Sequence, residues 1–129
     1  MSLDMLLGLD YGEKNIGLAV ADENSKMALP YKVLINNGED FVLQELKKII
    51  AEEKISKIIV GLPLALSGAE SRKTMEARGF SAFLAKNLDV AVEMKDERLS
   101  SRLADTMAQS AKNNRDIGAA MVILESYLV

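Results

Sequence analysis

The sequence contains 129 residues with a net charge of −3, 49% hydrophobic and 27% charged residues, and neither histidine nor cysteine. This length and composition are typical of one folded domain, which we take as residues 1–129, and they exclude a disordered chain. Without histidine or cysteine, Ser-His-Asp and Cys-His triads, disulfide bonds and the usual zinc sites are excluded, which leaves carboxylates, hydroxyls and lysines for any chemistry.

The first third of the chain predicts three consecutive strands. Met5–Asp10 is a compact apolar run, and a second run, Ile16–Val20, follows after a turn, which indicates a β-hairpin. A third extended stretch, Met27–Ile35, ends at the turn sequence Asn36-Asn37-Gly38. We expect these strands to form an antiparallel meander.

The rest of the chain alternates between helical and strand patterns. Val42, Leu46 and Ile49 recur at helical spacing, whereas 57–61 is a short β-branched run without alternation, typical of a strand buried on both faces. A capping box at Ser67 and Glu70 predicts the start of the next helix. We also expect a strand over 90–95 and helices over 99–113 and 117–128.

This order of elements predicts an α/β fold. Strands that alternate with helices form right-handed crossovers onto a parallel sheet. The expected architecture is therefore one mixed five-stranded sheet, made of the three-stranded meander and two parallel strands, with helices on both faces.

Four acidic residues lie where this fold can bring them together. Asp10 ends the first strand, Asp96 and Glu97 end the last strand, and Asp116 begins the final helix. The carboxyl edge of such a sheet is where ligands usually bind. Clustered carboxylates repel one another unless cations lie among them, and oxygen ligands suit Mg²⁺ or Mn²⁺. One or two such ions can activate water for phosphodiester hydrolysis.

Each acidic residue also has a purely structural explanation. Asp10 can be a turn former, because Tyr11-Gly12 follows it. Asp96 and Glu97 can be a solvated strand end with a local ion pair to Arg98. Asp116 can be only the N-cap of the last helix. The sequence by itself leaves both sets of explanations open.

Five further residues are candidates for substrate binding. Gly12 allows a close approach of substrate backbone, and Lys14 can contact a phosphate, although both also suit a plain hairpin turn. Ser100 and Ser101 lie at the expected start of a helix, a place suited to an anion as well as to a cap. Arg98 stands between these serines and the acidic pair and completes the set.

The net charge of −3 argues against nucleic acid as a partner, because most nucleic-acid binders carry a basic excess. The objection weakens if the four acidic candidates hold metal. Setting them aside leaves 16 basic residues against 15 acidic ones. The remaining surface is then close to neutral.

Several blocks of the chain, in this order and spacing, resemble the YqgF/RuvX family of RNase H-like proteins. The blocks are Leu9-Asp10-Tyr11-Gly12-Glu13-Lys14 with Ile16-Gly17-Leu18-Ala19-Val20, Val60-Gly61-Leu62-Pro63-Leu64, Asp96-Glu97-Arg98-Leu99-Ser100-Ser101, and Asp116-Ile117-Gly118-Ala119-Ala120. Two positions depart from the family pattern. Asn15 replaces an arginine of the turn, and Arg115 stands where the family tends to be apolar.

The resemblance implies an RNase H-like sheet and a metal-dependent nuclease. The acidic positions of the family pattern fall on Asp10, on Glu97 with Asp96 beside it, and on Asp116. The family is described as a Holliday junction resolvase by analogy of fold, and as the nuclease that matures the 5′ end of pre-16S rRNA. We therefore expect Mg²⁺ or Mn²⁺ as cofactor.

The leading hypothesis is a metal-dependent endonuclease that acts on pre-16S rRNA in ribosome biogenesis. The alternatives are a nuclease of branched DNA junctions and a non-catalytic module that binds structured RNA or the ribosomal or transcription machinery. A phosphotransferase remnant is a further alternative, since the Asp10-Tyr11-Gly12 turn is similar to the phosphate-binding hairpin of actin-like kinases. We expect a monomer or homodimer in the cytoplasm without membrane contact, because neither a bilayer-spanning stretch nor a signal peptide is evident.

Overall fold

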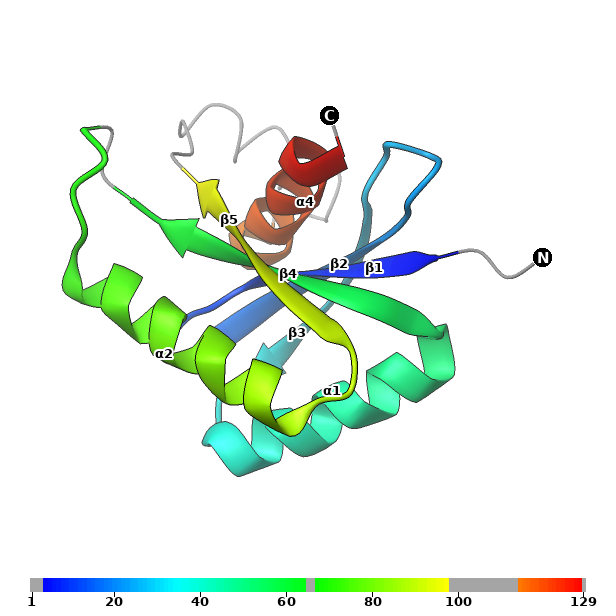
Figure 1. Ribbon diagram of the computed structural model, residues 1–129, viewed down its shortest axis with the longest axis horizontal. Coiled ribbons are helices and arrows are strands. Elements are labelled where there is room, and N and C mark those ends of the chain that lie inside the picture. Colours follow the sequence, from blue (N-terminus) through cyan, green and yellow to red (C-terminus); the bar gives the residue numbers. More distant parts are fainter. Residues whose placement is uncertain (1–3, 65–66, 98–113, 129) are drawn as a thin grey trace.

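The computed structural model describes residues 4–64, 67–97 and 114–128, with only the backbone of Glu97. Its centre is one five-stranded sheet in the order β3-β2-β1-β4-β5 (Figure 1). The first three strands are antiparallel neighbours, and β4 and β5 run parallel to β1. The strands are β1 (Met5–Asp10), β2 (Asn15–Asp22), β3 (Leu29–Ile35), β4 (Ile55–Pro63) and β5 (Ala91–Glu97).

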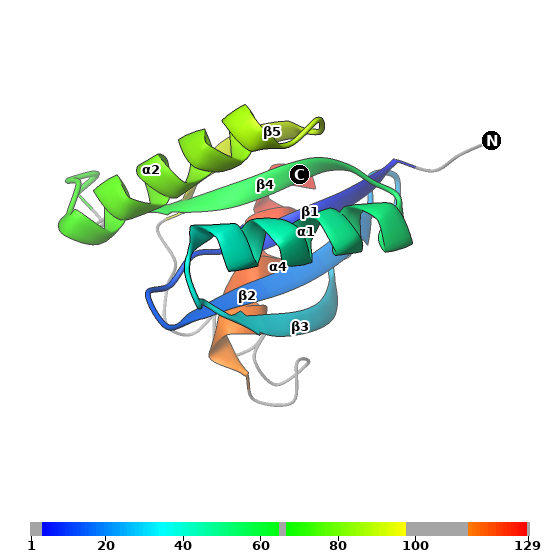
Figure 2. The same ribbon diagram turned by 90° about the horizontal axis from the view of Figure 1, so that it is seen from below.

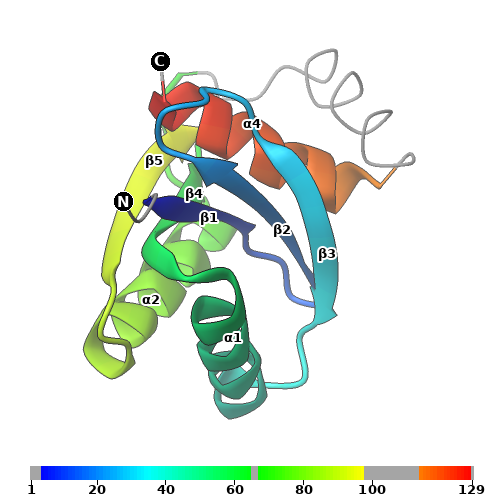
Figure 3. The same ribbon diagram turned by 90° about the vertical axis from the view of Figure 1, so that its right-hand side faces the viewer.

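The described helices cover the sheet on both faces. Helices α1 (Glu39–Glu53) and α2 (Arg72–Asn87) lie side by side on one face, and α4 (Arg115–Leu128) crosses the other face. Figure 3 shows the three layers edge-on, and Figure 2 shows α1 and α2 in front of the sheet. The predicted α/β architecture, with a meander and two parallel strands, is confirmed.

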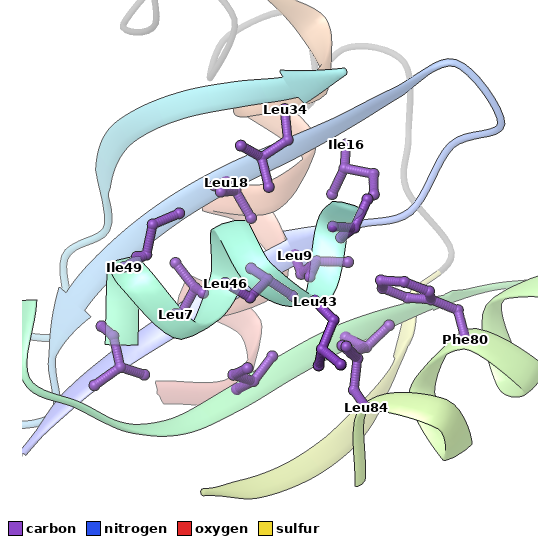
Figure 4. Close-up of a cluster of buried hydrophobic side chains, with 14 of the residues drawn as sticks. Leu7, Leu9, Ile16, Leu18, Leu34, Leu43, Leu46, Ile49, Phe80 and Leu84 are labelled. Atoms are coloured by element: carbon purple, nitrogen blue, oxygen red, sulfur yellow. The ribbon is translucent and has the colours of Figure 1, made fainter. Parts of the chain in front are cut away.

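The face under α1 and α2 is closed by large aliphatic side chains. Alternate residues of β1 and β2, among them Leu7, Leu9 and Leu18, point toward Leu46 of α1 and Leu84 of α2 (Figure 4). All five are fully buried. This alternation assigns the intervening residues of each strand, including position 10, to the opposite face.

The face under α4 is built around glycines. A Cβ on Gly8 would meet the carbonyl oxygen of Ala120, one on Gly61 would meet the side chain of Ile123, and one on Gly17 would collide with the backbone of Asp116. Glycine at these positions lets the helix backbone approach the strands more closely than any side chain would allow. The first turn of α4 therefore lies directly against the end of the β1–β2 hairpin.

The far end of α4 is held by a polar cluster. The ammonium group of Lys57 in β4 lies 2.7 Å from a carboxylate oxygen of Glu93 in β5 and donates a 2.9 Å hydrogen bond to the hydroxyl of Tyr127. The Tyr127 hydroxyl in turn donates to Glu93 at 3.3 Å. These contacts join α4 to two strands at the end of the helix that is remote from Asp116.

The predicted start of the second helix is wrong. The helix begins at Arg72, and its N-cap is Ser71, which exchanges hydrogen bonds with Thr74. Glu70 instead pairs with Arg78 at 3.0 Å. Thr74 takes the position usually held by glutamate in a capping box, and its hydroxyl also donates to the carbonyl of Pro63. The expected helix over 99–113 lies outside the described residues.

We predict opposite effects for two glycine-to-alanine substitutions. In Gly17→Ala the new methyl group clashes with the backbone carbonyl of Asp116, which should lower the free energy of unfolding by about 3 kcal/mol. Gly79→Ala adds a methyl group to an open position of α2 and should raise the free energy of unfolding by about 0.5–1 kcal/mol. Urea denaturation of both variants measures the effects. Equal stability of Gly17→Ala and the parent protein would contradict the close seating of α4.

Candidate active site

Asp10 lies at the carboxyl end of the central strand β1, on the face covered by α4. Its register partner in β2 is Gly17, the residue against which the Asp116 backbone packs. Gly8, two positions earlier on the same face, lies under Ala120. The Asp10 carboxylate is therefore partly enclosed between the hairpin and the first turn of α4.

Asp116 lies in that first turn but does not cap the helix. The capping residue is Asn114, whose side-chain oxygen accepts a 3.1 Å hydrogen bond from the Ile117 amide and whose carbonyl accepts from Gly118 at 3.0 Å. This geometry removes the N-cap as an explanation for the aspartate at position 116. The carboxylate of Asp116 is partly exposed and lies close enough to Asp10 for their charges to interact.

The enclosure of Asp10 raises the pKa of its carboxyl group from 3.8 to about 6. Burial is the main cause, because water no longer solvates the charge; Lys73 opposes the rise, and the negative charge of Asp116 adds to it. The turn explanation for Asp10 does not require such an environment. A carboxylate that is costly to ionise beside a second carboxylate is typical of a functional site.

Asp96 and Glu97 lie at the same edge of the sheet, at the end of β5. Asp96 is level with Leu62 and Glu97 with Pro63 in the neighbouring strand. Gly61 faces α4, so its partner in β5, Lys95, belongs to the α4 face, and Asp96 belongs to the α2 face. Asp10 and Asp96 therefore start from opposite faces of the sheet.

The turn between β1 and β2 is braced from the end of β3. The side-chain amide of Asn36 donates a 2.9 Å hydrogen bond to the carbonyl of Gly12, and its backbone amide donates at 2.8 Å to the carbonyl of Lys14. A Cβ on Gly12 would collide with the carbonyl of Asn15, so glycine is required here for reasons of packing. Lys14 and Asn15 are exposed.

The start of α2 and this turn together line a hollow of about 480 Å³. Two basic residues of α2, Arg72 and Lys73, belong to it and were not among the residues predicted from the sequence. The sequence feature that could have indicated them is the capping pair Ser71 and Thr74, because a helix that starts after Ser71 has Arg72 and Lys73 in its first turn. The hollow is lined by Tyr11, Gly12, Glu13, Lys14, Arg72, Lys73 and Glu76.

Part of the predicted site lies beyond the described residues. Arg98, Ser100 and Ser101 fall in the segment 98–113. Within the described part of the chain, no three carboxylates lie together as a metal-binding group, and the Glu97 side chain is not among those described. The described helices include none with the length and apolar character needed to cross a membrane.

The architecture is that of the RNase H-like resolvases. RuvC of T. thermophilus in complex with a Holliday junction substrate superposes with a TM-score of 0.67 at 13% identity, covering 97% of this chain and 93% of RuvC. The Fowlpox virus Holliday junction resolvase superposes with a TM-score of 0.61 at 13% identity, covering 96% of each chain. At these identities the likeness concerns the fold.

The family follows from the sequence comparison. The RuvX family model, described as "Holliday junction resolvase", matches residues 4–129, and the chain belongs to this family. A relative from Maridesulfovibrio salexigens, named "Putative pre-16S rRNA nuclease", is 38% identical and covers 95% of this chain and 96% of its own length. Relatives with the same name from Rickettsia felis and Chloroflexus aggregans are each 32% identical to this chain. The first alignment covers 95% of this chain and 84% of the relative, and the second covers 99% of this chain and 95% of the relative.

We predict that Asp10→Asn stabilises the metal-free protein. The difference between 3.8 and about 6 corresponds to a cost of about 2–3 kcal/mol for the ionised carboxylate, which the amide avoids. Between these two pH values the folded parent protein holds a proton that the unfolded chain releases, so its free energy of unfolding falls as the pH rises. The advantage of the variant should therefore be largest above pH 6 and vanish toward about pH 4.

Urea denaturation in EDTA across this pH range measures the effect. Asp89→Asn, which removes an exposed carboxylate in the turn before β5, is the matched control and should follow the parent curve. Parallel pH profiles for the parent protein and Asp10→Asn would show that Asp10 ionises at no cost.

Proposed function

We propose that this protein is a metal-dependent endonuclease that hydrolyses phosphodiester bonds in pre-16S rRNA. The observation that carries the proposal is the placement of Asp10 and Asp116 on one face, at the carboxyl edge of the sheet, where burial makes the Asp10 carboxylate costly to ionise and the charge of Asp116 adds to that cost. A bound cation would offset this cost of ionising Asp10 near Asp116.

The ligand that fits this site is Mg²⁺ or Mn²⁺. The donors are carboxylate oxygens, one partly buried and one partly exposed, and hard divalent cations prefer such ligands. Asp10, Asp116 and Glu97 would hold one or two ions. When bound, the metal supplies activation of water and stabilisation of the leaving oxygen.

The residues of the chain have separate roles in this proposal. Asp10 is the central ligand in this proposal because it lies on the middle strand of the sheet and its charge interacts with that of Asp116. The backbone register puts position 97 on the α4 face, with Asp10, and position 96 on the other face. Glu97 is therefore the ligand contributed by β5, and Asp96 lies further from the ions.

The choice of RNA as substrate is supported by the sequence relatives. Three relatives that align over most of their length are named for pre-16S rRNA. The Holliday junction resolvases with a similar fold share 13% of their residues with this chain, so they support the fold more than a particular substrate. In this proposal the protein acts in the cytoplasm, near ribosomal or transcription machinery.

Cleavage of branched DNA is the second candidate, favoured by the family description and by the superposition with RuvC on its junction. A junction nuclease needs two active sites related by symmetry, and thus a homodimer. A non-catalytic RNA-binding module is the third candidate. It differs from both in its independence of the acidic residues.

The first experiment compares cleavage of a 5′-extended pre-16S rRNA fragment and a four-way DNA junction. With Mn²⁺ the parent protein should cut the RNA, and EDTA should abolish cutting. Asp10→Asn and Asp116→Asn should lower the rate at least about 100-fold, since even outer-shell partners of a metal contribute 10–100-fold. Cleavage by Asp10→Asn at the parent rate would overturn the proposal, and RNA binding without cleavage by the parent would favour the non-catalytic module.

The two acidic residues at the end of β5 should respond differently to substitution. Glu97→Gln should lose cleavage to the same extent as Asp10→Asn, whereas Asp96→Asn should retain most of it, because the strand register places the two positions on opposite faces. Single-turnover rates with Mn²⁺ measure both variants. The reverse ranking would assign the metal to Asp96.

A further inference from the structure

The hollow between the β1–β2 turn and the start of α2 has a charge unlike that of the whole chain. Three basic side chains, Lys14, Arg72 and Lys73, line it against two acidic ones, Glu13 and Glu76, which leaves one net positive charge. The chain as a whole carries −3. Positive charge is thus gathered at the place where a substrate would approach Asp10.

The cations of the hollow differ in what they contact. Arg72 donates a 3.1 Å hydrogen bond to Glu76, four residues later in α2. Within the described part of the chain, the side chains of Lys14 and Lys73 form neither an ion pair nor a hydrogen bond. Both lysines are exposed, so their ammonium groups are available to an anion.

Lys73 connects the hollow with the acidic site. It lines the hollow, and its charge is near enough to Asp10 to act on that carboxylate. Lys14 lies on the opposite wall, in the turn that follows Asp10. A strand of nucleic acid whose scissile phosphate lies at Asp10 would therefore bring a neighbouring phosphate into the hollow.

Both walls of the hollow are fixed by buried or short contacts. The start of α2 is tied to the end of β4 by Thr74, which is fully buried and donates to the carbonyl of Pro63. The turn is tied to β3 by the hydrogen bond from Asn36 to Gly12. These contacts hold the backbone at positions 14 and 73 in place relative to the sheet.

We propose that this hollow binds a backbone phosphate of the substrate next to the bond that is cut, and that Lys73 is the positioning residue that holds it. The inference rests on the proposed nuclease function and names the protein's contact to the substrate backbone. A phosphate contact of this kind fixes the register of the nucleic acid without reading its sequence. Lys73 touches no reacting atom in this arrangement, and it acts by orienting the strand.

The test is the salt dependence of RNA binding without metal. Binding of a fluorescein-labelled, 5′-extended pre-16S rRNA fragment is measured in EDTA from about 50 to 200 mM salt, where each phosphate contact contributes about 0.7–0.9 to the slope of log K against log salt. Lys73→Gln should reduce the slope by this amount and weaken binding several-fold. Lys73→Arg keeps the charge and should restore the parent slope.

The control is Lys86→Gln, which makes the same change in charge at the other end of α2, away from the hollow. Its slope should equal that of the parent protein. If Lys73→Gln also keeps the parent slope, the inference is wrong, whether or not the protein cuts RNA. A four-way DNA junction in a parallel series shows whether the contact is shared by both nucleic acids.

Cleavage measurements separate this inference from the proposed function. In Mn²⁺, Lys73→Gln should raise KM for the RNA several-fold more than it lowers kcat, and Lys86→Gln should leave both unchanged. If RNA binding by the parent protein depends on Lys73 but the RNA is not cut, the phosphate site stands and the proposed nuclease function is wrong. If the parent protein and Lys73→Gln cut RNA equally well, the nuclease function stands and the proposed phosphate site is wrong.

Discussion

The contact between α4 and the glycines beneath it is the constraint on which the acidic site depends. Asp10 and Asp116 are separated by most of the chain, and no hydrogen bond among the described residues joins their side chains. They meet because Gly17 and Gly8 leave room for the helix backbone and because the polar cluster around Lys57 holds the other end of α4. A side chain at Gly17 would tilt or lift the helix and move one carboxylate away from the other.

The same contact explains why ionisation of Asp10 is unfavourable in the absence of a cation. Helix α4 excludes water from Asp10 and brings the negative charge of Asp116 toward it. Both effects disfavour the ionised form of Asp10. Aliphatic packing on the other face, under α1 and α2, offsets this cost. The two faces of the sheet thus differ, because one holds the large aliphatic core and the other carries the proposed acidic site.

The fold was predictable from the sequence because its signals are local. Apolar runs of strand length, a change to helical spacing after Gly38 and the unbroken run before Gly61 all report on neighbouring residues. Asp10 was identified for the same reason, as an acidic end to an apolar strand. The start of α2 was missed because Thr74 performs the role that glutamate usually has in a capping box.

What the sequence could not provide are relations between elements. Spacing alone does not reveal that Asp116 lies over Gly17, that Asn114 rather than Asp116 caps the helix, or that Asp96 belongs to the α2 face. The proposed role of Lys73 could not be predicted from the sequence, since it depends on how close the start of α2 lies to the end of β1. Each of these relations follows from packing or register between distant segments.

The position of Asp116 in the last described helix also orders events in time. A ribosome adds about 5–20 residues per second, so Asp10 is synthesised roughly 5–20 s before Asp116. Strands β2 to β5 are added to the chain during this interval, before α4, so the pair of carboxylates is not yet assembled. The two carboxylates therefore come together only after Asp116 has been synthesised and α4 packs against the sheet.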